Sequence, residues 1–87
     1  LPRDSDEIAN VGRMVGYPSW MEAMLPGDIL FFAGSRRMIT HTAIYLGDGK
    51  VIHSLGRGVQ IQSMNPDDPD YAESLGRRFA FAKRIFE

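Results

Sequence analysis

Apolar and polar positions follow a helical period near the start of the chain. Apolar side chains recur at helical spacing, at Ile8, Val11, Met14 and Val15. This pattern predicts a short amphipathic helix over about residues 5–15. The acidic stretch at residues 4–7 is typical of a helix start, where carboxylates face the positive end of the helix dipole. Gly16 and Pro18 then break the pattern, so we expect the helix to end there.

From Asp28 onward the pattern is that of strands. Residues 28–33 are apolar at nearly every position, as in a central strand covered on both faces. Four further strands are expected over residues 40–46, 50–55, 59–64 and 78–86. A polar loop over residues 65–76, with a helical turn around residues 71–75, separates the last two. A helix followed by a run of strands predicts an α+β domain, with a short N-terminal helix and a five-stranded antiparallel sheet.

Composition narrows the class of protein. The 87 residues suffice for one small domain. The formal net charge of −1 gives no general attraction to nucleic acid, and no apolar run approaches the roughly 20 residues of a transmembrane helix. There is no cysteine, so disulfides and thiolate metal sites are excluded. The opening "LPRDSDEIANVG" lacks an initiator Met and resembles the interior of a domain, so we expect a portion of a longer domain.

The segment "THTAIYLGDGKVIHS", residues 40–54, holds the two histidines of the chain, His41 and His53. Side chains alternate between the two faces of a strand, so the hairpin register decides whether both histidines share a face. A two-residue loop pairs Ile44 with His53 and sends His41 to the other face. A three-residue loop pairs Ala43 with His53 and places His41 diagonally from it, roughly 7–8 Å away at the backbone. We favour the three-residue loop, with Gly49 in a left-handed conformation.

Three interpretations of this histidine pair remain open from the residues alone. Both can be structural strand residues. They can also form a two-histidine metal site, although the pair lacks a carboxylate or thiolate as a further ligand. The third interpretation is a general base, oriented by the second histidine, that serves a nucleophile elsewhere.

The order of several motifs resembles the C-terminal half of the NlpC/P60 cysteine peptidases, papain-like enzymes that cut peptidoglycan stem peptides. The resemblance rests on "LPGDILFF" followed by "THTAIYLGDGKVIHS", on the final "RRFAFAKRIF", and on the opening "LPRDS". It covers nearly all of the chain, residues 1–87. The family often carries Gln where Ile8 stands, so the opening segment departs from the pattern at that position.

The resemblance implies roles for particular residues. His41 would be the catalytic base and His53 the side chain that orients it. The nucleophile would be a cysteine at the start of a helix upstream of Leu1, which would leave this chain inactive alone. "PRDS" is similar to the subset called γ-D-glutamyl-L-diamino acid endopeptidases, or dipeptidyl-peptidase VI. Asp4 and Ser5 would there bind the free amino end of L-Ala-γ-D-Glu-diamino acid peptides, although both residues can equally cap the first helix.

Two functions from different classes follow. The first is a cell-wall peptide hydrolase without cofactor or metal, for which Thr40 is a further candidate to line the substrate site. Such an enzyme is expected in the cell envelope, the periplasm or outside the cell, or in cytoplasmic peptide recycling. The second is a catalytically silent, SH3-like module that binds a peptide. A cysteine-bearing helix upstream would distinguish the two.

Overall fold

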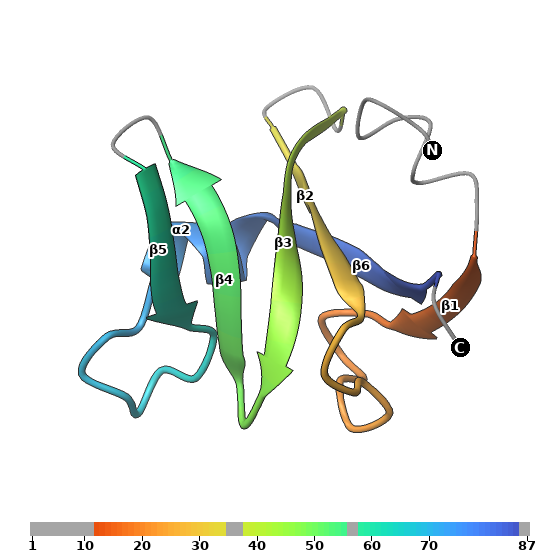
Figure 1. Cartoon of the computed structure of the whole chain (residues 1–87), viewed down its shortest axis with the longest axis horizontal. Coiled ribbons are helices and arrows are strands. Elements are labelled where there is room, and N and C mark those ends of the chain that lie inside the picture. Colours follow the sequence, from red (N-terminus) through yellow and green to blue (C-terminus); the bar gives the residue numbers. More distant parts are fainter. Residues whose placement is uncertain (1–11, 35–37, 56–57, 86–87) are drawn as a thin grey trace.

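The computed structural model describes residues 12–34, 38–55 and 58–85. These residues form one antiparallel sheet of six strands in the order β1-β6-β2-β3-β4-β5, with one short helix (Figure 1). The strands are β1 (Arg13–Gly16), β2 (Ile29–Ala33), β3 (Ile39–Gly47), β4 (Lys50–Leu55), β5 (Gly58–Ser63) and β6 (Phe79–Arg84), and the helix is α2 (Glu73–Arg78). The expected α+β domain with an antiparallel sheet is therefore confirmed. Among the described residues, no helix is long and apolar enough to cross a membrane.

The number of strands and the place of the helix differ from the expectation. The predicted helix over residues 5–15 lies mostly outside the described residues, but its last part is wrong. Residues 13–16 form β1, which pairs with β6 at the sheet edge. Met14 is exposed and Val15 is buried, although the four residues of β1 do not alternate strictly, since its register with β6 shifts between Met14 and Gly16. Pairing with β6 outweighs the helical period, because a short helix is marginal without tertiary support.

The main core cluster lies on one face of the sheet, under α2, whereas Phe31 is buried on the opposite face against Phe81. Buried side chains of β2, β4 and β6, including Leu30, Phe32 and Val51, pack with Leu75 of α2. Figure 1 shows α2 in pale blue, behind β4 in that view. The expected helical turn around residues 71–75 is in fact the helix α2, which begins two residues later and runs on to β6. The central position of β2 agrees with its continuous apolar sequence.

A buried ion pair joins the start of β2 to the end of β6. Asp28, 2% exposed, accepts two hydrogen bonds of 2.9 Å from the guanidinium of Arg84 and one of 2.8 Å from the N–H of Leu25. Arg84 also donates to the carbonyl of Ala23. Burial by itself would raise the pKa of Asp28, but these hydrogen bonds and the charge of Arg84 outweigh it and hold the pKa below its ordinary value of 3.8. The contact fixes the loop that precedes β2.

Candidate active site

The turn between β3 and β4 sets the face to which each histidine points. Gly47 pairs with Lys50, so the turn itself is Asp48-Gly49. Both turn residues have positive φ, 53° and 78°, as the two central residues of a type I′ turn require. The register then shifts at Leu46, the extra residue of a bulge in β3. The expected three-residue loop is therefore wrong, since a two-residue turn and a bulge replace it.

The bulge nevertheless produces the expected register. Ile44 pairs with Ile52, which places Ala43 opposite His53. His41 then lies diagonally from His53 on the same face of the sheet. The predicted sharing of one face by both histidines is confirmed by the contact between their rings.

The two imidazole rings are joined by a hydrogen bond. Nε2 of His41 lies 2.8 Å from Nδ1 of His53, and the rings meet edge to face at a centroid distance of 5.0 Å. His53 is 5% exposed. The ring of His41 also packs against that of Phe32, with centroids 5.7 Å apart. Two rings held in this way have little freedom to reorient, as a positioned proton acceptor requires.

Gln62 of β5 completes the chain of hydrogen bonds, and it was missed in the sequence. Its Oε1 lies 2.6 Å from Nε2 of His53. His53 pairs with Gln60 across the strands, so Gln62 is its diagonal neighbour on the same face. Gln60 and Gln62 are two positions apart in β5, so both lie on the face of His53. This spacing is visible in the sequence and was a signal that could have identified Gln62.

The pKa of His41 is lowered from its ordinary value of 6.5. Burial is the main cause, because it disfavours the charged form of the ring, and the positive charges of His53 and Arg78 add to it. A neutral imidazole is the form that can accept a proton. At a given pH, a smaller fraction of His41 than of an exposed histidine is therefore protonated.

A cavity of about 320 Å³ adjoins the histidine pair. Its lining includes Thr40, His41, His53, Gln62, Ser74 and Arg78. Arg78 donates a hydrogen bond of 2.9 Å to the hydroxyl of Thr40, so the candidate substrate residue Thr40 does lie beside the histidines. Asp4 and Ser5, the other two candidate substrate residues, lie outside the described residues. Within the described part of the chain, no group of three or more metal-ligating side chains is brought together.

An imidazole whose far nitrogen is held by a second polar side chain is the general-base arrangement of peptidases and related hydrolases. Here the pair lies on an antiparallel sheet of the α+β class. The chain belongs to the NlpC/P60 family, because the family model matches residues 1–74. The resemblance seen in the sequence motifs is thereby confirmed.

Individual relatives agree with the family. The chain is 34% identical over 77 residues to a gamma-D-glutamyl-L-lysine dipeptidyl-peptidase of Bacillus subtilis, a match that covers 86% of this chain and 25% of the relative. It is 42% identical over 57 residues to a gamma-DL-glutamyl hydrolase of the same organism, covering 62% of this chain and 13% of the relative. The chain thus spans a quarter or less of the length of these curated relatives.

A solved structure shows the same fold. The crystal structure of an NlpC/P60 family protein from Bacillus cereus superimposes with a TM-score of 0.77 at 30% sequence identity. The match covers 100% of this chain and 27% of that protein. The described sheet therefore corresponds to part of a larger family member.

Proposed function

We propose that residues 1–87 are the C-terminal portion of an NlpC/P60 catalytic domain. In its complete form this domain would hydrolyse the amide between the γ-carboxyl of D-Glu and a diamino acid in cell-wall peptides. The observation that carries the proposal is the chain of hydrogen bonds from His41 through His53 to Gln62. The names of the relatives, a γ-D-glutamyl-L-lysine dipeptidyl-peptidase and a γ-DL-glutamyl hydrolase, support the substrate class.

We propose a placement of the protons that is consistent with these hydrogen bonds. The carbonyl oxygen of Gln62 can only accept, so Nε2 of His53 carries the proton of that bond. In a neutral His53 the other nitrogen, Nδ1, is then an acceptor. The bond to it must be donated by Nε2 of His41. The lone pair of His41 is left on Nδ1, and this is the nitrogen that we assign as the general base.

The chemistry follows from this placement. Since the chain has no cysteine, we propose that a cysteine upstream supplies the thiol. The thiol proton passes to Nδ1 of His41, and the thiolate attacks the γ-carbonyl carbon of D-Glu. The C–N bond breaks as His41 returns the proton to the leaving amine, and a thioester remains. Water, deprotonated by His41, then hydrolyses the thioester and frees the thiol.

The opposite face of the sheet supports the view that the domain has a further part. Ile29, Ile44, Ile52 and Ile61 pair in a row across four strands. Ile44 is 48% exposed and Ile61 is 56% exposed. A contiguous apolar row of this kind is usually covered by another element. We propose that one part of the upstream chain covers this row, that the cysteine-bearing part lies on the opposite face beside His41, and that Asp4 and Ser5 bind the substrate ammonium there.

The test is hydrolysis of L-Ala-γ-D-Glu-L-Lys by residues 1–87 joined to the cysteine-bearing segment of the domain. We expect His41→Ala to lower kcat by about 10²- to 10⁴-fold, the range of general-base catalysis. His53→Ala should lower it less, because it removes only the orientation of His41. Gln60→Ala is the matched control, since Gln60 faces His53 across the strands without a described hydrogen bond to it.

Two results would contradict the proposal. One is cleavage of the peptide by the 87 residues alone, which contain no thiol. The other is binding of the peptide by the joined protein without cleavage, which would favour the silent peptide-binding module instead.

A further inference from the structure

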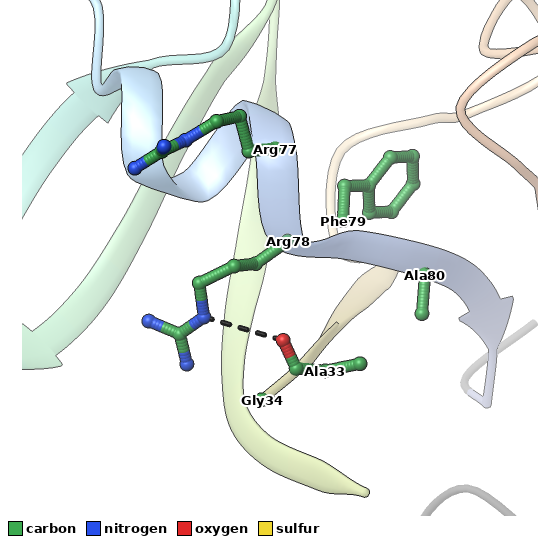
Figure 2. A pocket seen from close by; sticks show the side chains of 6 residues that line it. All are labelled: Ala33, Gly34, Arg77, Arg78, Phe79 and Ala80. Carbon is green, nitrogen blue, oxygen red and sulfur yellow. Dashed lines mark hydrogen bonds between the residues drawn. The ribbon is translucent and has the colours of Figure 1, made fainter. Parts of the chain in front are cut away.

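The cavity beside the histidine pair has an unbalanced charge. Of its lining residues, Arg78 alone carries a fixed charge, and no carboxylate is among them. A second cavity of about 580 Å³ shares Arg78 and adds Arg77 to its lining (Figure 2). Described carboxylates that form ion pairs do so elsewhere: Asp28 pairs with Arg84, and Asp68 and Asp70 pair with Lys50. The wall next to His41 is therefore electropositive.

The guanidinium of Arg78 is held in a defined orientation. Its Nε–H donates to the carbonyl of Ala33 at 3.3 Å, as the dashed line in Figure 2 shows, and an N–H of Nη2 donates to Thr40 Oγ1 at 2.9 Å. A guanidinium has five N–H donors, so three donors remain after these bonds. Figure 2 also shows that the side chain of Arg77 extends away from that of Arg78. Only Arg78 of the two lines the cavity beside the histidines.

Two hydroxyl groups add directional donors to the same cavity. Thr40 uses its oxygen to accept from Arg78, which leaves its O–H proton free to donate to a ligand. Ser74 of α2 lines the cavity as well. A fixed guanidinium beside hydroxyl donors suits a planar, negatively charged acceptor such as a carboxylate. It does not suit a cationic group, because the cavity lining holds no negative charge to bind it.

We propose that this cavity is a carboxylate subsite, in which Arg78, Thr40 and Ser74 bind a carboxylate of the peptide substrate next to His41. The inference rests on the proposed function and adds the group that is recognised. Two carboxylates of such peptides have this chemistry: the free α-carboxylate of the γ-linked Glu, and the carboxylate of the diamino acid. Arg78 thus selects acidic peptides over their amidated forms.

The kinetic test compares three peptides on the joined protein. They are L-Ala-γ-D-Glu-L-Lys, the same peptide with the Glu α-carboxylate amidated, and the same peptide with the Lys carboxylate amidated. For one of the two amidated peptides, kcat/KM should be at least about tenfold lower than for L-Ala-γ-D-Glu-L-Lys, as expected for loss of a charge-assisted hydrogen bond. Which amide falls identifies the carboxylate that binds.

Variants separate this subsite from general effects. Arg78→Gln should lower kcat/KM for the acidic peptide about tenfold and abolish its preference over the sensitive amide. Arg78→Lys should retain part of the preference, because it keeps the charge but loses the fork of donors. Arg77→Gln is the matched control in the same helical turn and should leave the preference unchanged.

A binding test does not depend on hydrolysis. L-Ala-γ-D-Glu with its γ-carboxyl blocked as the methylamide, the α-amide of that compound, L-Lys and L-Lys amide are each titrated into the 87-residue chain while the ring signals of His41 are followed by NMR. The bound carboxylate offsets the charge of Arg78, so it should raise the pKa of His41, whereas its amide should not. The response should be lost in Arg78→Gln and kept in Arg77→Gln.

The outcomes distinguish the subsite from the proposed function. Equal cleavage of all three peptides, with Arg78→Gln indistinguishable from the parent, would overturn the subsite and leave the peptidase standing. Absence of any cleavage together with a charge-dependent response of His41 would overturn the peptidase and leave the subsite standing. An equal response of His41 to acid and amide would also overturn the subsite.

Discussion

In the proposed arrangement, the amide oxygen of Gln62 sets the direction of the hydrogen bonds through both imidazole rings. Gln62 then accepts from Nε2 of His53, His53 accepts from Nε2 of His41, and the free lone pair falls on Nδ1 of His41. Because the amide of Gln62 is uncharged, it can orient these hydrogen bonds without adding a negative charge near His41. This agrees with the lowered pKa of His41, which a carboxylate at the same position would oppose. On the proposed assignment, His41 therefore acts as a neutral base and is not held in the protonated, imidazolium form.

At the scale of elements, the β3–β4 hairpin holds the histidines in register, and its turn depends on backbone conformations that few residues adopt. Gly49 has a φ of 78°. It is also held on both sides: its N–H donates to the Tyr45 hydroxyl, and its carbonyl accepts from the N–H of Met64. These contacts prevent the turn from relaxing around a larger side chain.

We therefore expect Gly49→Val to lower the free energy of unfolding by about 1–2 kcal/mol, the cost of a left-handed conformation for a residue with a Cβ. Asp48→Asn is the matched control, because Asn tolerates the same region as Asp. The measurement is urea unfolding followed by circular dichroism. Equal midpoints for Gly49→Val and the parent would show that the turn can change type at no cost.

At the scale of the whole molecule, Asp28 and Arg84 join segments 56 positions apart. The pKa of Asp28 is lowered in the folded state, so the folded state binds this proton less readily than the unfolded chain does. The stability from this group is complete above about pH 4, the unfolded value. It is lost as the pH falls through the lower folded pKa.

Asp28→Asn should lower the free energy of unfolding by about 3 kcal/mol, because it removes the buried carboxylate charge that the guanidinium of Arg84 contacts. It should also reduce the fall in stability between about pH 4 and pH 2. Asp70→Asn, at the exposed pair with Lys50, is the control and should change stability little. Thermal unfolding over this pH range is the measurement. The same acid sensitivity in Asp28→Asn and the parent would argue against the role of this carboxylate.

The sequence predicted those strands in which apolar side chains either alternate with polar ones or follow one another without interruption. The strand over residues 50–55 was placed correctly, and β2 was recognised from its apolar run. β1 was missed because its structure depends on pairing with β6, some 70 positions away in the chain. The histidine register was predicted, yet the bulge at Leu46 was not, since turn and bulge together give the same pairing as a longer loop. The alternation of glutamines was a sequence signal for Gln62, but its contact with His53 depends on the pairing of β5 with β4. The place of Arg78 beside the histidines depends on the position of α2.

The position of the proton on His41 tests the general-base assignment most directly. Since the chain has two histidines, long-range ¹⁵N–¹H NMR spectra at a pH at which the rings are neutral give two sets of signals. We predict that both rings are protonated at Nε2 and bare at Nδ1. Gln62→Leu should let the His53 proton distribute over both nitrogens, and Gln60→Leu should change nothing. A His41 ring that carries its proton on Nδ1 would contradict the assignment of His41 as the base.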